Sequence, residues 1–124
     1  MKSNNPISEE ADAGTSDELY EMANLYPRTT GLPMTIWVGP RGNARHDVRI
    51  KVNLAQGNQM NIDNTAVVGV RPAPHMVAGG LSSDDQRLVF EWIRVNEGTI
   101  IGYWNGNIDT AELIQNLKPM PPRP

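Results

Sequence analysis

The sequence predicts one α+β domain, in which a small, mainly antiparallel sheet from residues 33 to 71 is covered on one face by one long helix over residues 83–105, with a short C-terminal helix behind it. Three observations lead to this prediction. HDVRIKV, residues 46–52, alternates apolar and polar residues with the period of a strand. The long helix has apolar residues at helical spacing. Asp109 and Glu112 have the spacing of a capping box that begins the short helix.

Two further segments have the composition of strands. MTIWV, residues 34–38, is β-branched and aromatic and lies between a proline and a Gly-Pro pair. TAVVGV, residues 65–70, is a more continuous apolar run, as expected for a strand that is covered on both sides. HDVRIKV, by contrast, places Asp47, Arg49 and Lys51 on the side opposite its apolar residues. It is therefore expected to be a half-buried strand with one wet, largely basic face.

The long helix is predicted to be continuous despite its glycines. On a helical wheel Gly98 and Gly102 fall on the wet side, opposite Val89. The residues within about 60° of Val89 are Trp92, Ile93, Asn96, Ile100, Tyr103 and Trp104. Ser83 with Gln86 has the spacing of a capping box at its start, and Asn105-Gly106 supplies its end. The core is predicted to consist of Trp37, Val48, Ile50, Val52, Val68, Val89, Trp92, Ile93, Ile100 and Trp104.

Charge divides the chain into unlike segments. Residues 1–27 hold six acidic residues against one lysine, a net charge of −5, whereas residues 28–71 hold six basic residues against two acidic ones, a net charge of +4. The polar composition of residues 1–27 predicts a disordered acidic arm, with a short helix over residues 16–26 as its one ordered alternative. Residues 28–118 are predicted to form the domain, followed by a Pro-rich tail at 119–124.

Several function classes find no support in the sequence. The absence of cysteine excludes disulfides, thiol catalysis and cysteine metal sites, and the two histidines lie on separate elements, so we expect no metal and no cofactor. Without a nucleophile and a positioned base, we expect no enzyme. The sequence has no apolar run long enough to span a membrane, so we expect a cytoplasmic protein without membrane contact. We expect it to be a monomer or a small homo-oligomer.

The strongest candidate site is a basic strip. Arg45, Arg49 and Lys51 are predicted to share one strand face at steps of about 7 Å. Arg41 lies in the adjoining turn, and Trp37 on the neighbouring strand is positioned to stack on a base. Such a strip suits phosphate contact, but it also suits an ordinary solvated sheet face that repels edge pairing. The sequence pI of about 5.3 disfavours a dedicated nucleic-acid-binding protein.

The segment R-L-V-x-E-W at residues 87–92, together with Trp104 and LKPM at residues 117–120, resembles a small bacterial family, domain of unknown function 4160. The resemblance covers residues 31–120. Members of that family are often encoded beside an antitoxin-like protein. The family typically has Pro-Pro-His-x-His where this chain has His46 and Val48, and many members have a histidine where this chain has Asn96.

The resemblance implies a small regulatory or protein-interaction module with a protein partner, one half of a toxin-antitoxin-like pair. The alternative from the residues themselves is a nucleic-acid-binding protein that uses the basic strip. A third hypothesis, a ribonuclease toxin with arginine and His46 as its chemistry, lacks a second base in the sequence.

Overall fold

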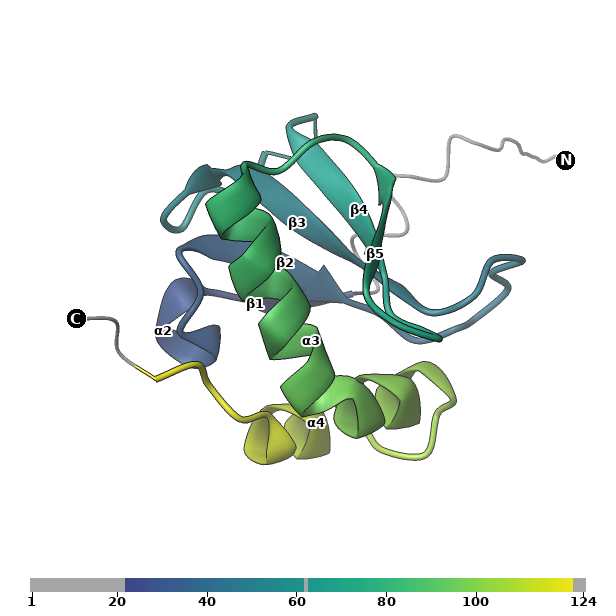
Figure 1. Cartoon of the computed structure of the whole chain (residues 1–124). Helices are drawn as coiled ribbons and strands as arrows, with labels where there is room; N and C mark the ends of the chain where they lie inside the picture. Colours follow the sequence, from purple (N-terminus) through teal and green to yellow (C-terminus); the bar gives the residue numbers. More distant parts are fainter. Residues whose placement is uncertain (1–21, 62, 122–124) are drawn as a thin grey trace, which may run out of the picture.

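A five-stranded antiparallel sheet with a long helix across one face forms the centre of the fold, as the computed structural model of residues 22–61 and 63–121 describes it (Figure 1). This is the α+β fold that the sequence predicts. The elements are β1 (Ala23–Leu25), α2 (Pro27–Thr30), β2 (Met34–Val38), β3 (Arg49–Gln56), β4 (Thr65–Gly69), β5 (His75–Ala78), α3 (Ser83–Trp104) and α4 (Thr110–Asn116).

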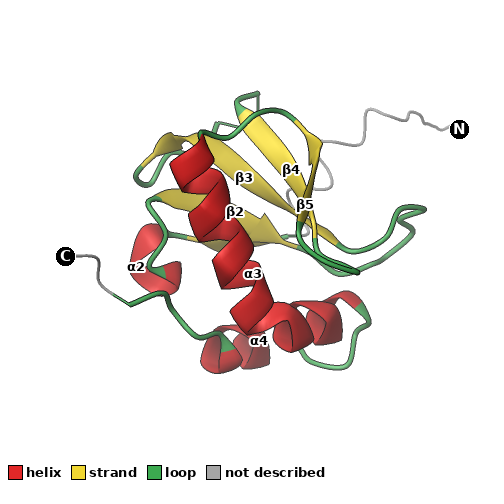
Figure 2. Ribbon diagram, viewed as in Figure 1, coloured by secondary structure: helices red, strands yellow, loops and turns green. Residues whose placement is uncertain are grey.

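The strands follow one another across the sheet in chain order, β1-β2-β3-β4-β5 (Figure 2). β2 coincides with the predicted strand, and β3 begins three residues later than predicted and continues to Gln56. The predicted sheet, limited to residues 33–71, is too narrow. β1 and β5 add a strand at each edge, although each has only three or four residues and shows no clear alternation of apolar and polar residues.

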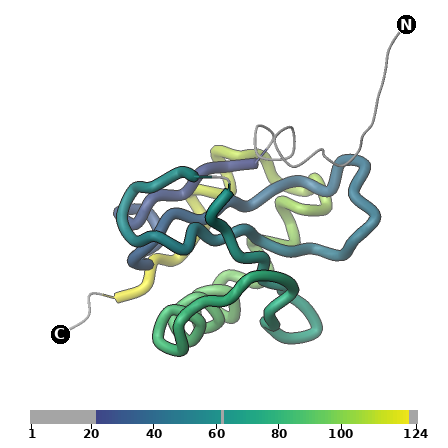
Figure 3. Tube along the Cα trace, turned by 90° about the horizontal axis from the view of Figure 1, so that it is seen from above, coloured from purple at the N-terminus to yellow at the C-terminus, as the bar shows by residue number. Residues whose placement is uncertain are grey.

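The two faces of the sheet are distinct. Register places Ile36 opposite Val52 and Ile50 opposite Val68, and all four side chains are buried beneath α3. We call this the inner face, and the side away from α3 the outer face. Seen from above, the first half of α3 lies on one side of the strands (Figure 3). All ten predicted core residues are buried, and nine of them belong to the core cluster. Trp37 is the exception, because it lies on the outer face of the sheet.

α3 is a single helix of 22 residues. Its N-cap is Ser82, whose hydroxyl accepts a hydrogen bond from the Asp85 N–H, so the predicted cap at Ser83 is one residue too late. A Cβ added at Gly98 would meet no atom within 4 Å, in agreement with the predicted wet side. The helix ends at Asn105 and Gly106, where a φ of 79° favours glycine.

The C-terminal segment is tied back to the domain. Asp109 and Glu112 form the predicted capping box of α4, and Leu113 is buried. The side-chain amide of Asn96 then donates to the Lys118 carbonyl and accepts from the Lys118 N–H, at 3.0 and 2.7 Å. The Met120 N–H donates to the Thr30 carbonyl at 2.7 Å. Met120, in the predicted Pro-rich tail, is thus hydrogen-bonded to the fold, as is Lys118 just before it.

Most of the predicted acidic arm, residues 1–21, lies outside the described residues. The last part of the helix considered over residues 16–26 is wrong, because Ala23–Leu25 form β1 instead. The physical reason is pairing: Leu25 lies opposite Ile36 and Ala23 opposite Val38, and both side chains are buried. Within residues 22–61 and 63–121, no helix has the length and apolar character needed to cross a membrane.

Candidate functional site

The structure disperses the predicted basic strip. Lys51 is the third residue of β3 and lies on the outer face, and Arg49 is the first residue of that strand. Arg45 and Arg41 lie in the loop before it, residues 39–48, so the prediction that Arg45 belongs to the strand is wrong. β2 and β3 pair only as far as Val38 and Ile50, and the chain between them departs from the sheet. Arg41 and Arg45 are exposed, Arg49 is half-buried and Lys51 is only 7% exposed.

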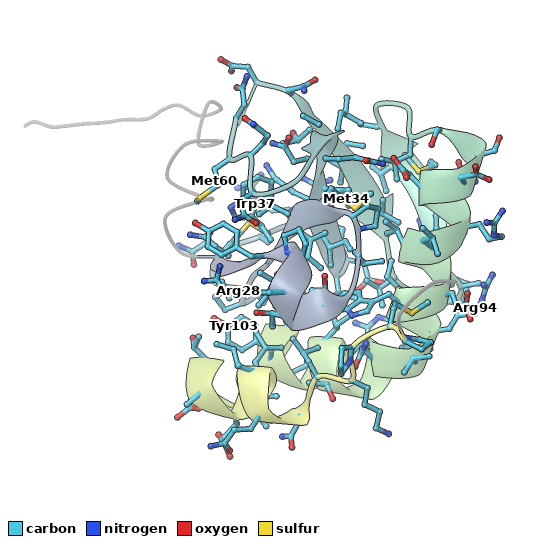
Figure 4. All side chains as sticks on the ribbon, turned by 90° about the vertical axis from the view of Figure 1, so that its left-hand side faces the viewer. Arg28, Met34, Trp37, Met60, Arg94 and Tyr103 are labelled. Carbon is cyan, nitrogen blue, oxygen red and sulfur yellow. The ribbon has the colours of Figure 1, made fainter. Side chains whose placement is uncertain are left out.

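Trp37 also lies on the outer face, directly opposite Lys51 in the register of β2 and β3. Its side chain is 1% exposed, so it is not available to stack on a base from solvent as the sequence suggested. In Figure 4, Trp37 and Met60 lie on the opposite side of the view from Arg94 of α3. The structure therefore brings Trp37 and Lys51 together but buries both, and it leaves Arg41 and Arg45 in solvent.

The loop that carries these two arginines is fixed against the C-terminal end of α3. The Arg41 N–H donates to the Trp104 carbonyl at 2.9 Å, and the Ala44 N–H donates to the Arg41 carbonyl at 2.8 Å. The rings of His46 and Trp104 lie 5.5 Å apart between centroids and are tilted by 36°. The first contact satisfies a carbonyl that the end of a helix leaves without an intrahelical partner.

An ion pair fixes the other end of the loop. The Arg71 guanidinium donates to both carboxylate oxygens of Asp47, at 2.8 to 3.0 Å. The hydrogen bond from Arg71 lowers the pKa of Asp47 and in turn raises the pKa of Arg71. Because Asp47 stays ionised and engaged, it is a poor proton acceptor for chemistry at the neighbouring His46. We call Arg41, Arg45, His46, Asp47, Arg71 and Trp104 the loop-end site.

The loop-end site was visible in the sequence only as scattered charges. Asp47 and Arg71 are separated by 24 positions, and no pattern in the sequence links them. His46 and Trp104 are farther apart still. The one available signal was the last turn of α3, which has no basic residue. The free carbonyls at this helix end therefore need hydrogen-bond donors from elsewhere in the chain.

Chemically, the loop-end site can bind anions. The guanidinium groups of Arg41 and Arg45 are exposed, and a guanidinium fits carboxylate and phosphate oxygens in a two-pronged hydrogen bond. His46 is half-buried against Trp104 and so presents a restricted surface. Over the part of the chain that the structure describes, no three His, Asp or Glu side chains are grouped so that they could hold a metal ion.

A second group of side chains lies near the outer face. The guanidinium carbon of Arg28 is 4.9 Å from the ring centre of Tyr26, within the range of a cation–π contact. The Tyr26 hydroxyl donates to the Met60 sulfur at 3.0 Å. Figure 4 shows Arg28 and Met60 on the side of the molecule where Trp37 lies. These contacts hold the segment after β1 against the loop between β3 and β4.

Comparison of the chain with protein-family models, with curated proteins and with solved structures finds no match. The resemblance of residues 31–120 to domain of unknown function 4160 stays a prediction.

Proposed function

We propose that this protein is a small protein-interaction module whose loop-end site binds acidic side chains on a partner protein. The observation that carries the proposal is the anchoring of loop 39–48 at both ends. The Arg41 N–H is held by the Trp104 carbonyl, and Asp47 is held by Arg71, while Arg41 and Arg45 between these anchors are exposed.

Anchoring matters because association has to offset the entropy of ordering loops and side chains at the interface. A loop whose backbone is already fixed loses less freedom on binding than a free one. Exposed arginines at the rim of an interface act mainly on the rate of encounter and on partner choice, through charge complementarity. The partner surface is therefore expected to be acidic where it meets the loop-end site.

The family resemblance supports the same class of function. It implies that the partner is the product of a neighbouring gene, and that the two proteins form a toxin-antitoxin-like pair. An acidic region on that gene product would fit Arg41 and Arg45. We propose this identity for the partner on the resemblance alone. The proposal that the loop-end site is the binding surface does not depend on it.

The test is a binding titration between the purified protein and the neighbouring gene product. Arg41→Ala and Arg45→Ala should each weaken binding several-fold, mainly by slowing association, and the loss should shrink as salt is added. Arg87→Ala and Arg94→Ala remove exposed arginines from α3, of which Arg87 is paired with Asp84, and serve as controls. Equal losses of affinity in all four variants would show that binding depends on overall charge and not on the loop-end site. Complete absence of binding would reject the pair.

Nucleic acid is the second candidate ligand, because the same exposed guanidiniums suit phosphates. Fluorescence anisotropy with a generic RNA and a generic DNA distinguishes the two. If phosphates are bound, affinity should fall steeply with salt, and each of Arg41→Ala and Arg45→Ala should reduce the slope by about one unit or less. The burial of Trp37 removes the stacking residue from this hypothesis, which is why we place it second.

A further inference from the structure

A short row of residues crosses the outer face where β3, β4 and β5 lie side by side (Figure 2). Arg49 of β3 lies directly opposite Gly69 of β4, and Gly69 lies directly opposite His75 of β5. Side chains of paired residues point to the same face of a sheet, and Arg49 precedes Ile50, whose side chain enters the core on the inner face. Arg49 and His75 therefore share the outer face, with only a glycine between them.

The imidazole of His75 occupies the space that Gly69 leaves open. A Cβ added at Gly69 would overlap the Cε1 and Nε2 atoms of the His75 ring. The ring thus reaches from β5 over β4, with this edge above Gly69. Neighbouring strands are about 5 Å apart, so the same edge lies one strand away from Arg49. Any other residue at position 69 would displace the ring from this place.

The contacts of the His75 ring assign a role to each of its nitrogens. Nδ1 lies 2.8 Å from the Ala73 carbonyl oxygen. A carbonyl oxygen only accepts hydrogen bonds, so Nδ1 carries the proton, and Nε2 of the neutral ring is an acceptor. The His75 side chain is exposed. Its Nε2 is therefore a fixed acceptor that a ligand on the outer face can reach.

Arg49 presents a donor without an acceptor. Its side chain is half-buried, and its Nε–H is buried with no hydrogen-bond partner among residues 22–61 and 63–121. Such a donor is costly in the folded chain, and more so when the group is charged. Asp47, two residues earlier, accepts from Arg71 with both of its carboxylate oxygens. The Arg49 guanidinium is therefore suited to an anion that comes from outside the chain.

We propose that Arg49 and His75 form a binding site for inorganic hydrogen phosphate on the outer face of the sheet. An oxygen of the anion accepts from the Arg49 Nε–H, and the O–H of the same anion donates to Nε2 of His75. Sulfate and carboxylates offer acceptor oxygens alone at neutral pH, and a phosphate monoester loses its last O–H with a pKa of about 6. Free hydrogen phosphate supplies both groups. The site uses none of the loop-end residues, so it does not depend on the proposed function.

The first test is a calorimetric titration of the full chain at about pH 8, where an imidazole is ordinarily neutral. Inorganic phosphate, sulfate and methyl phosphate are compared at equal ionic strength. Phosphate should bind at least about ten-fold more tightly than the other two anions, because only phosphate gives Nε2 of His75 a donor. Equal affinity for the three anions would overturn the proposal, and so would the absence of phosphate binding.

Substitutions then locate the bound anion. Arg49→Met and His75→Phe should each weaken phosphate binding at least about ten-fold. Arg94→Ala, which removes an exposed arginine from α3, is the control and should leave phosphate affinity unchanged. A loss of affinity in Arg41→Ala or Arg45→Ala, with none in Arg49→Met, would place the anion at the loop-end site and reject the site on the sheet.

A last measurement needs no substitution and is independent of the folding of the variants. Long-range proton–nitrogen NMR spectra of the free protein should show the His75 proton on Nδ1. Phosphate should shift the signals of His75 Nε2 and of the Arg49 Nε–H, whereas sulfate should leave Nε2 unchanged. A proton on Nε2 in the free protein, or shifts confined to other arginines, would contradict the proposal.

Discussion

The two faces of the sheet are made by alternate residues of the same strands, yet they are built on different principles. On β3, Ile50 and Val52 enter an apolar core beneath α3, while Lys51 and Asn53 are buried on the opposite side of the sheet, with Lys51 directly opposite Trp37. Apolar burial on the inner face needs only matching shapes. Burial on the outer face needs specific partners, because each polar atom removed from water has to be satisfied. Alternation in a sequence therefore tells which residues share a face, but not whether the second face is wet.

The largest effect is expected on the inner face. Trp92 is fully buried, and Trp92→Ala should reduce the free energy of unfolding by about 3 to 5 kcal/mol through lost contact and a cavity. Urea denaturation gives this value. Arg94→Ala, two residues along the same helix and exposed, is the control and should change stability by no more than about 0.5 kcal/mol. Similar losses of stability in both variants would show that substitutions on either side of α3 destabilise the fold.

A smaller loss is expected on the outer face. The Asn53 side chain donates to the Asn61 carbonyl and accepts from the Ala55 N–H, so Asn53→Ala leaves two backbone groups without their partner. The free energy of unfolding should fall by about 1 to 3 kcal/mol. Asn24→Ala, on the same face but exposed, is the matched control and should be close to neutral. If Asn53→Leu were as stable as the parent, the outer face would tolerate apolar packing and the contrast between the faces would disappear.

The side of α3 that faces away from the sheet should respond in the opposite direction. Gly98→Ala should stabilise the protein by up to about 1 kcal/mol, because a methyl group meets no atom there and alanine favours helix. Gly79→Ala is the contrasting variant, since Gly79 has a φ of 79° and its Cβ would lie 2.9 Å from the Ala66 Cα. Thermal melts should show Gly98→Ala above the parent and Gly79→Ala below it. A large destabilisation by Gly98→Ala would mean that α3 is covered on this side in solution.

The smallest effect concerns a pair outside both faces. Arg71 lowers the pKa of Asp47 in the folded chain, so this pair stabilises the fold above the pKa of an unfolded aspartate, about 3.9. That stabilisation is lost as the pH falls through the lowered folded-state pKa. Asp47→Asn should therefore lower the melting temperature slightly near neutral pH and make no difference in strong acid. A difference between the two proteins that persists unchanged at low pH would assign the effect of Asp47 to packing.

Much of the inner half of the fold could be predicted from the sequence, for reasons that lie in particular residues. MTIWV forms β2 over the predicted residues, since β-branched residues and flanking prolines and glycines mark a strand by themselves. The continuous period of α3 and the reciprocal bonds of Asp109 and Glu112 at α4 are also local signals. β1, α2 and β5 were missed because each has only three or four residues and depends on its neighbours for stability.

The candidate site was less predictable than the fold. Its charges were recognised, but their exposure depends on contacts between distant parts of the chain. Lys51 is buried on the outer face, although the alternation predicts that it is exposed. Arg45 lies outside the sheet because the pairing between β2 and β3 stops at Ile50. The residues that anchor the loop, Trp104 and Arg71, are distant from it in the sequence. The alternation in HDVRIKV therefore gives no information about them.

The contact between Asn96 and Lys118 has a mechanical consequence. A side-chain amide that bonds both the N–H and the carbonyl of one residue holds the backbone as an adjacent strand would, and the bond from Met120 to Thr30 adds a second attachment two residues later. A force that pulls on the C-terminus meets these attachments before it reaches α4. Extension from this end is therefore expected to begin with a resisted step, in which the bonds at Met120 and Lys118 break in turn, and only then to unwind α4. The hydrogen bonds of the buried Asn96 amide are therefore expected to make the segment around Lys118 resist extension.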